Sequence, residues 1–210
     1  MKKIPFALLA CACALAVSMP AARAQTYPDK PVRLIVPWPP GGITDVIARA
    51  IGQRLSETLG QQFIVDNRAG AGGTVGAAAV AKSPADGYTL LINDMGGHSS
   101  APSLYSKLPY DAIKDFAPVM MVAGSPMVLI ANPVHNVRSL PQLIELAKNK
   151  PGALNYASSG SGAITHLGMV RVMRMSGIDM AHVPFKGSVP ATSSVIAGET
   201  AVAFSTIPAA

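Results

Sequence analysis

The segment VRLIVPWPPGGITD, residues 32–45, decides how the chain begins to fold. Its first five residues form a short run that is apolar and β-branched apart from Arg33, which is typical of a buried strand. From residue 46 to residue 59, apolar side chains recur at helical spacing. The prolines between them fix φ and lack N–H groups, while Gly41 and Gly42 permit a tight turn or the close approach of another molecule. The segment therefore predicts a strand, a turn and a helix.

This turn is a candidate anion site. The free N–H groups of the first helical turn, together with the positive end of the helix dipole, favour an anion beside Pro40, Gly41 and Gly42. No lysine follows the glycines as in a nucleotide P-loop, so a carboxylate is favoured over a nucleotide phosphate. Thr44 or Asp45 is expected to cap the helix, and Asp45 is equally a candidate to accept a ligand amine or to order a water. An ordinary tight turn fits the same residues.

Residues 1–24 read as a signal peptide. Lys2 and Lys3 precede an apolar run over residues 4–17, too short to span a bilayer, and residues 22–24 form a small-x-small cleavage site. Cleavage before Gln25 and export to a bacterial periplasm are expected. The segment holds both cysteines, so the mature chain is expected to lack disulfides and thiolate chemistry.

The charge of the mature chain is mild. Loss of the three basic residues of the signal segment lowers the formal net charge from +6 to +3. The basic residues are dispersed and aromatic residues are sparse, which argues against a nucleic-acid groove. A small anionic ligand is compatible with this charge.

The rest of the chain alternates between strand and helix patterns. Such alternation predicts an α/β fold of parallel sheets flanked by helices, in which ligands bind beyond the carboxyl ends of strands. The loops expected to form a site follow Val36, Ile92, Ala157 and Phe185, and the segment after Ile92 is expected to be a polar, Gly-rich loop over residues 95–100. Glycine and serine dominate these loops, so backbone N–H groups and hydroxyls are the expected ligand contacts.

Several motifs in fixed order resemble one known family over nearly all of residues 25–210. They are YPDKPVRLIVPWPPGG at 27–42, DNRAGAGG at 66–73, DGYTLL at 86–91, LPYD at 108–111, DFAPV at 115–119, LNYAS at 154–158 and HVPFKG at 182–187. This pattern is similar to the Bug-type receptors, the extracytoplasmic substrate-binding proteins of tripartite tricarboxylate transporters.

The resemblance implies two α/β lobes of the periplasmic binding protein type that close over a cleft. Residues 25–124 would belong to lobe one and residues 125–210 to lobe two, with the first crossing between lobes over residues 117–131, interrupted at 124–126. Family members continue beyond the point where this chain stops, so it is expected to be truncated at the C-terminus, with both lobes partial.

The resemblance also implies the ligand and the site. The expected ligand is a small di- or tricarboxylate, amino acid or aromatic acid, with no cofactor, metal or catalytic residue. The expected partners are the membrane permease subunits of the transporter, and the protein is expected to be a monomer. The residues that match the family in the cleft loops are Trp38, Pro40, Gly41, Gly42 and Asp45 in lobe one, and Ser158, Gly160, Ser161, His166, Lys186 and Gly187 in lobe two.

Two other functions stay open from the sequence. A ligand-sensing partner of a membrane sensor kinase would use the same capture step as a transport receptor. An exported hydrolase or isomerase would need a positioned nucleophile and base or a metal cluster. Residues 158–162 lack the Gly-x-Ser-x-Gly elbow, and the four histidines have no metal-ligand spacing.

Overall fold

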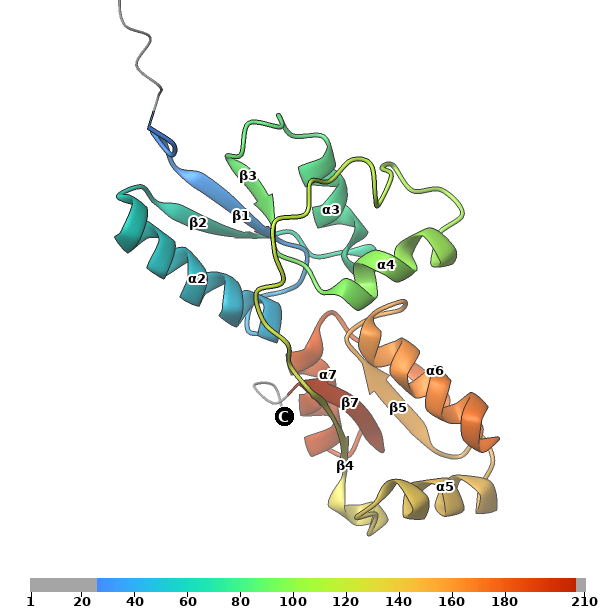
Figure 1. The fold of residues 1–210 in the computed structure, drawn as a ribbon. Helices are drawn as coiled ribbons and strands as arrows, with labels where there is room; N and C mark the ends of the chain where they lie inside the picture. Colours follow the sequence, from blue (N-terminus) through green and yellow to red (C-terminus); the bar gives the residue numbers. More distant parts are fainter. Residues whose placement is uncertain (1–25, 207–210) are drawn as a thin grey trace, which may run out of the picture.

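The structure, a computed structural model, describes residues 26–206 and consists of two α/β lobes, each built on its own sheet (Figure 1). The predicted α/β fold with parallel-rich sheets is confirmed. The predicted signal peptide, with both cysteines, lies outside the described residues. Within residues 26–206, no helix combines the length and apolar character needed to cross a membrane.

The first lobe contains a fully parallel sheet of three strands. Its strands are β1 (Val32–Val36), β2 (Phe63–Asn67) and β3 (Thr89–Leu91), in the order β2-β1-β3. The central strand β1 is covered by α2 (Ile43–Leu59) and α3 (Thr74–Ala81), and its residues Val32 and Leu34 form a core with Phe63. Burial on both faces explains why β1 is a continuous apolar run.

Two flanking glycines determine where helix α2 begins and ends. Gly42 is the N-cap in an extended conformation, and Gly60 ends the helix with a φ of 71° in the left-handed region that favours glycine. Gly52 faces the sheet, where a Cβ would lie 3.1 Å from Leu34 Cδ1. This close packing holds the N-terminus of α2 at the carboxyl end of β1.

The second lobe contains a mixed sheet in the order β4-β7-β5-β6. Strands β5 (Asn155–Ser158), β6 (Ala181–Pro184) and β7 (Val202–Thr206) are parallel, and β4 (Met127–Ala131) runs antiparallel to β7. The helices are α5 (Leu140–Asn149), α6 (Ile164–Ser176) and α7 (Ser188–Ile196), with short 3₁₀ turns at Pro133–His135 here and Ala71–Gly73 in the first lobe. Tyr156, Met169 and Leu143 are the largest side chains of its core.

One segment differs from the sequence-based expectation. The Gly-rich segment after Ile92 was expected to be a loop, but it forms helix α4 (Met95–Leu104). Asp94 caps this helix, because its Oδ1 accepts a hydrogen bond from the Gly97 N–H at 2.6 Å. Glycine, serine and an internal Pro102 hid the helix from propensity arguments, whereas the Asp94 cap was the available signal.

Residues 117–126 lead from the first lobe into β4 without regular structure, and all are exposed (Figure 1). Val119 and Met120 are 81% and 74% exposed despite being large and apolar. The lobe division at residues 124/125 stays a prediction.

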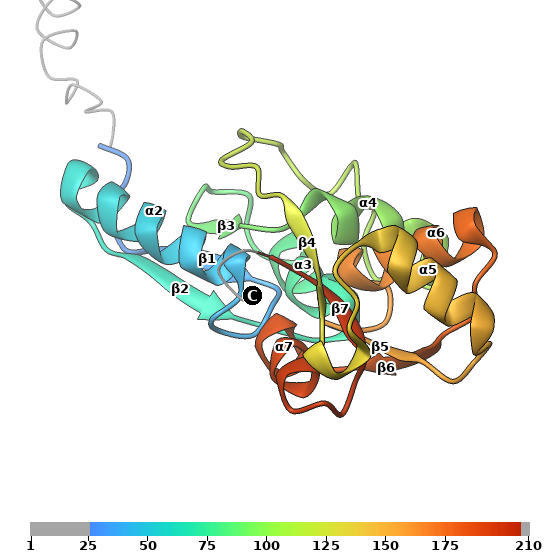
Figure 2. The same cartoon turned by 90° about the horizontal axis from the view of Figure 1, so that it is seen from below.

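The two lobes meet at the β1–α2 turn and the N-terminus of α7, which lie side by side when the molecule is seen from below (Figure 2). A Cβ on Gly187 would lie 3.0 Å from Pro39 Cγ, and a Cβ on Gly41 would lie 3.4 Å from Val189 Cγ2. Glycine at these positions therefore permits a close approach of the two lobes.

Gly76 in α3 gives a test of this packing. A Cβ there would lie 2.7 Å from Pro37 Cβ and 3.0 Å from the Arg68 carbonyl oxygen, which are atoms that cannot easily move aside. Gly76→Ala is expected to reduce the free energy of unfolding by about 1–3 kcal/mol through overpacking, measured by urea denaturation. Gly124→Ala, which meets nothing within 4 Å, is the control. Stabilisation by Gly76→Ala, as helix propensity alone would give, would contradict the packing.

Candidate ligand-binding cleft

The carboxylate of Asp45 holds the β1–α2 turn in place through hydrogen bonds. Its Oδ2 accepts hydrogen bonds from the Gly41 N–H and from Arg49 Nε, each at 3.0 Å, and its Oδ1 accepts one from Asn67 Nδ2 at 2.9 Å. Asn67 also donates to the Trp38 carbonyl oxygen at 3.0 Å. The strand end of β2 and the first turns of α2 thus determine the path of the turn between them.

Asp45 is buried, with 3% of its surface exposed. Burial by itself raises the pKa of this carboxyl, but the hydrogen bonds from Arg49, the Gly41 N–H and Asn67 outweigh it, so its pKa is below the usual value. Both oxygens are engaged within the protein. Asp45 therefore acts on the turn and does not line the cleft.

In the second lobe, the opposite wall is the β5–α6 loop, residues 158–163, which we call the cleft loop. Thr165 holds it from α6, since its Oγ1 accepts the Ser159 N–H at 3.0 Å and lies 2.8 Å from Ser159 Oγ. The Ser159 carbonyl oxygen accepts the Gly187 N–H at 3.1 Å. This bond ties the cleft loop to the β6–α7 turn.

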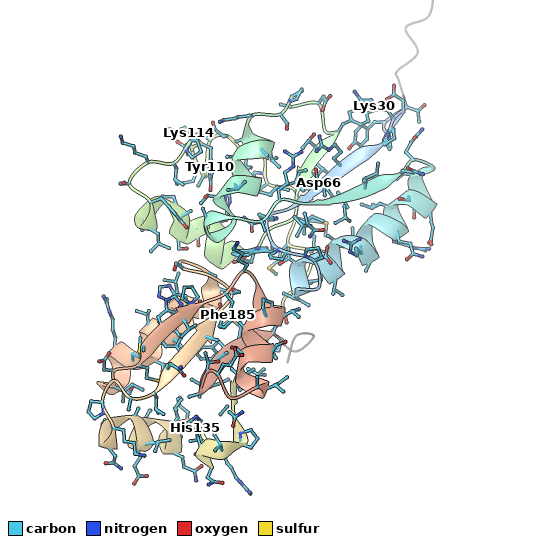
Figure 3. The ribbon with its side chains drawn as sticks, turned by 180° about the vertical axis from the view of Figure 1, so that it is seen from behind. Lys30, Asp66, Tyr110, Lys114, His135 and Phe185 are labelled. Carbon is cyan, nitrogen blue, oxygen red and sulfur yellow. The ribbon has the colours of Figure 1, made fainter. Side chains whose placement is uncertain are left out.

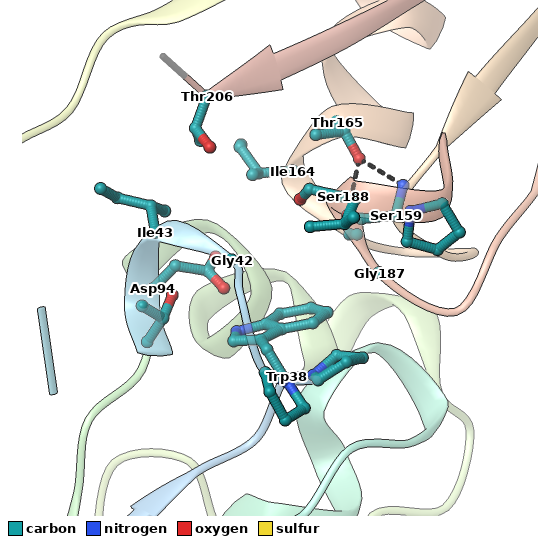
Figure 4. A pocket seen from close by; sticks show the side chains of 16 residues that line it. Trp38, Gly42, Ile43, Asp94, Ser159, Ile164, Thr165, Gly187, Ser188 and Thr206 are labelled. Carbon is teal, nitrogen blue, oxygen red and sulfur yellow. Dashed lines mark hydrogen bonds between the residues drawn. The ribbon is translucent and has the colours of Figure 1, made fainter. Parts of the chain in front are cut away.

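Two cavities open between the lobes, and Trp38, Pro39 and Ser159 line both. The narrow cavity has a volume of about 70 Å³ and lies among the N-termini of α2, α6 and α7 (Figure 4). The wide cavity has a volume of about 580 Å³ and lies between the cleft loop, residues 69–72 and Lys186. Together they form a cleft beyond the carboxyl ends of β1, β5 and β6.

Three helix N-termini line the narrow cavity without a side-chain cap. The N-cap residues are Gly42 for α2, Ala163 for α6 and Gly187 for α7, and none supplies a capping hydrogen bond from its side chain. The first N–H groups of an α-helix have no partner within the helix, and they carry the positive end of its dipole. The narrow cavity is therefore surrounded by unpaired donors, an arrangement suited to an anion.

Charged side chains are sparse around the cleft. Among the described residues, Asp94 is the only charged one lining the narrow cavity, and Lys186 is the only one lining the wide cavity. Asp94 already caps α4. Within residues 26–206, no group of three or more His, Cys, Asp or Glu side chains is placed to hold a metal ion.

The residues chosen from the sequence divide into three groups. Trp38, Pro40, Gly42 and Gly187 line the narrow cavity, whereas Gly160, Ser161 and Lys186, again with Trp38, line the wide one. Gly41, Asp45, Ser158 and His166 line neither cavity; Gly41 is exposed where the two lobes meet, and the other three support the loops that form the walls. Sequence reasoning missed the lining residues Asp94, Tyr105, Ser159, Ile164, Thr165 and Thr206. The helical cap at Asp94 and the Ser-Gly pattern of the cleft loop were the signals that pointed to two of them.

Ser158 and His182 form a hydrogen-bonded pair that the sequence did not reveal. Ser158 Oγ lies 2.7 Å from His182 Nε2, the arrangement of a nucleophile and its base. Ser158, however, is completely buried and lines neither cavity. Within residues 26–206, no carboxylate hydrogen-bonds to the His182 ring to orient it. The pair is therefore a structural contact beneath the cleft loop.

A cleft between two α/β lobes, walled by turns at the carboxyl ends of parallel strands, is the arrangement found in two-lobed solute-binding proteins. Residues 47–210 match the tripartite tricarboxylate transporter family receptor, TctC, and the chain belongs to this family. The family and its solved relatives are receptors that bind solutes and are not enzymes, which confirms the prediction of a receptor.

Individual members of this family and solved structures are similar to the chain over most of its length. It is 42% identical over 191 residues to the protein BugT of Bordetella pertussis, with 89% of this chain and 57% of BugT covered. A Rhodopseudomonas palustris protein solved with adipate has 38% identity and a TM-score of 0.84, covering 87% of this chain and 61% of that one. MatC from the same organism, solved with bound malate, has 32% identity and a TM-score of 0.80, covering 86% and 62%. The chain thus spans little more than half the length of the curated relatives that it matches.

Asp45→Asn tests the role of this carboxylate. At neutral pH the substitution is expected to lower the free energy of unfolding by about 1–2 kcal/mol, because the amide cannot accept all of the carboxylate's hydrogen bonds. Asp45 has a lowered pKa in the folded protein, so its contribution is present above the unfolded value of about 3.9 and is lost as pH falls through the folded value. Urea unfolding should therefore show a difference at pH 7 that shrinks toward pH 3.

The control for this measurement is Glu57→Gln on the same helix, where an exposed pair with Arg54 should contribute within about 0.5 kcal/mol. An Asp45→Asn effect as small as that of the control at pH 7 would contradict a role in holding the turn.

Proposed function

We propose that this protein captures a small carboxylate in the cleft and presents it to the membrane subunits of a tripartite tricarboxylate transporter. The observation that carries the proposal is the convergence of three helix N-termini, without side-chain caps, on one narrow cavity between the lobes. Backbone N–H groups from both lobes would hold the same carboxylate group. Ligand binding would thereby favour the closed arrangement of the lobes.

The chemistry of the narrow cavity suits a carboxylate. Hydrogen bonds to a charged acceptor are shorter and stronger than neutral ones, about 1.5–3 kcal/mol each. The volume of about 70 Å³ is several times the roughly 10–15 Å³ that a cavity needs to hold one water, so the narrow cavity has room for a carboxylate group. The remainder of the ligand would then extend past Trp38 into the wide cavity.

The wide cavity supports a ligand with a second anionic group. Lys186 is exposed, follows β6 and supplies the positive charge there. Solved relatives carry adipate and malate, which are both dicarboxylates. Their presence supports a diacid, with one carboxylate on the helix N-termini and the other near Lys186.

Location and partners follow from the same proposal. The N-terminal segment has the features of a signal peptide, so the receptor would work in the periplasm, as its solved relatives are described to do. The permease subunits would recognise the closed form. The protein would act as a monomer without a cofactor.

The proposal is tested by a thermal-shift screen of the protein against mono-, di- and tricarboxylates and acidic amino acids. A ligand that binds only the folded state raises the melting temperature by mass action. We expect a saturable increase with at least one small diacid. A folded protein whose melting temperature responds to no acid would overturn the carboxylate assignment.

Gly42→Leu tests the narrow cavity. Gly42 has a φ of −75°, which any residue can adopt, and a Cβ there would meet only the Pro39 carbonyl oxygen, at 3.9 Å. A leucine side chain is expected to fill the cavity and lower diacid affinity at least about tenfold, while the free energy of unfolding changes by less than about 1 kcal/mol. Calorimetric titration and urea unfolding measure the two quantities.

Gly42→Ala serves as the smaller step in the same series. Its affinity should lie between that of the wild type and that of Gly42→Leu. Unchanged affinity in the leucine variant would place the ligand elsewhere, and unfolding of both variants would assign Gly42 a purely structural role.

Lys186→Gln tests the second anionic contact. Affinity for adipate should fall about fivefold, the scale of one exposed charge pair, whereas affinity for hexanoate, of equal length with one carboxylate, should not change. Lys150→Gln, at the exposed end of α5, removes the same charge and is the control for net charge. Equal losses for both acids would remove Lys186 from the recognition of a second carboxylate.

A further inference from the structure

We propose that the stacked imidazoles of His166 and His182 position the cleft loop and make ligand binding sensitive to pH, with binding weakened when they take up protons. The inference rests on the proposed function, because the cleft loop, residues 158–163, is a wall of the proposed ligand cleft. Neither histidine lines a cavity, so both would act through the loop.

The two rings form one stack. His166 lies in the first turn of α6 and His182 lies on β6, and their ring centroids are 4.1 Å apart with an interplanar angle of 13°. The Tyr156 ring on β5 is nearly parallel to both imidazoles, with its centroid 4.8 Å from that of His182 and 6.4 Å from that of His166. Three elements of the second lobe thus meet in this stack directly beneath the cleft loop.

Hydrogen bonds connect the stack to the loop at both ends. Near the loop's end, the Gly162 N–H donates to His166 Nδ1 at 3.1 Å. At its start, Ser158 Oγ lies 2.7 Å from His182 Nε2 and accepts the Gly160 N–H at 3.2 Å. Ser159, Gly160 and Ser161, which lie between these points, line the cavities, as does Ala163 at the end of the loop. The positions of the cleft-lining atoms therefore depend on the two rings.

This arrangement requires a neutral His166 ring and disfavours a positive charge on both rings at once. Nδ1 of His166 can accept the Gly162 N–H only when it carries no proton. Two imidazolium rings 4.1 Å apart would also repel each other. Protonation consequently removes the acceptor at Gly162 and introduces repulsion within the stack.

The surrounding groups reinforce this requirement. Burial lowers the pKa of His166 and of His182, and the neighbouring His166 lowers the pKa of His182 further. The titratable group that faces the pair from β5 is Tyr156, whose pKa is raised by burial, so it stays neutral. Within the described part of the chain, no carboxylate forms an ion pair or hydrogen bond with either ring to favour its charged form.

The direction of the pH effect follows by linkage. A loosened loop would release the histidines toward their ordinary pKa of about 6.5, whereas the ordered loop keeps their pKa values lower. The ordered loop is therefore favoured above about pH 6.5 and loses population as pH falls below it. Apparent ligand affinity falls in proportion to the fraction of protein whose loop is ordered. By the same linkage, ligand binding should lower the pKa values of both histidines.

Two substitutions retain the hydrogen bonds while removing the titration. In His166→Asn the amide oxygen takes the place of Nδ1 as acceptor for Gly162. In His182→Gln the terminal amide lies near the place of Nε2, within reach of Ser158. His135→Asn is the matched control, because His135 lies at the far end of the second lobe from the cleft (Figure 3).

The experiment measures affinity for adipate and malate between pH 7.5 and 5 by calorimetric titration. We expect wild type and His135→Asn to lose about tenfold more affinity across this range than the double variant His166→Asn/His182→Gln. Because each comparison uses the same acid at the same pH, ionisation of the acid itself cancels. Parallel pH profiles for wild type and the double variant would overturn the inference. If the double variant does not fold, His166→Asn alone is compared.

A second readout does not depend on a ligand. In NMR titrations of the free protein, the Gly162 amide signal should move with the same midpoint as the His166 imidazole, below the ordinary histidine value, and His166→Asn should raise the midpoint of His182. A Gly162 amide that is indifferent to His166 titration would overturn the inference even if diacids bind. If neither acid binds at pH 7.5, the proposed function fails, and the Gly162 response still decides the role of the histidines.

Discussion

The feature on which the rest of the cleft depends is the set of unpaired backbone N–H groups at the starts of α2, α6 and α7. A helix that follows a parallel strand begins at the carboxyl edge of its sheet. In this structure the carboxyl edges of the two sheets face each other. Gly42, Ala163 and Gly187 lack the side chains that normally satisfy these donors. In the proposed function, an anion shared between the lobes would supply the missing acceptors, so that ligand binding and lobe closure would be coupled.

The carboxylates near the cleft bond to groups of the protein itself and leave the proposed ligand contacts to backbone N–H groups. Asp94 caps α4 through the Gly97 N–H, and Asp45 holds the Gly41 N–H, Arg49 and Asn67 beneath the β1–α2 turn. Each satisfies donors of the protein itself and stabilises the walls. The second lobe uses His166, His182 and Thr165 for the same purpose beneath the cleft loop. Rigid supports behind backbone-lined walls allow a site with few charged side chains to keep its geometry.

Periodicity and glycine placement sufficed to predict β1, α2 and the turn between them, because these depend on contacts local in sequence. The α4 helix was missed, since its glycines, serines and Pro102 have poor helix propensity and only packing and the Asp94 cap favour it. Asp45 and His166 were chosen as cleft residues, but their hydrogen bonds turn them away from the cavities toward the loops that they support. The Ser158–His182 contact joins residues 24 positions apart. Which side of a loop such residues occupy is decided by tertiary structure, and spacing along the chain does not reveal it.

The most direct test of the account is an NMR titration of the isotope-labelled protein with adipate and malate, following every backbone amide. The account predicts saturable shifts of the amides in the first turns of α2, α6 and α7, at Ile43, Thr44, Ile164, Thr165, Ser188 and Val189, all with one dissociation constant. Shifts confined to one lobe, or saturable shifts that leave these amides unmoved, would contradict the claim that helix N-termini of both lobes hold the same carboxylate.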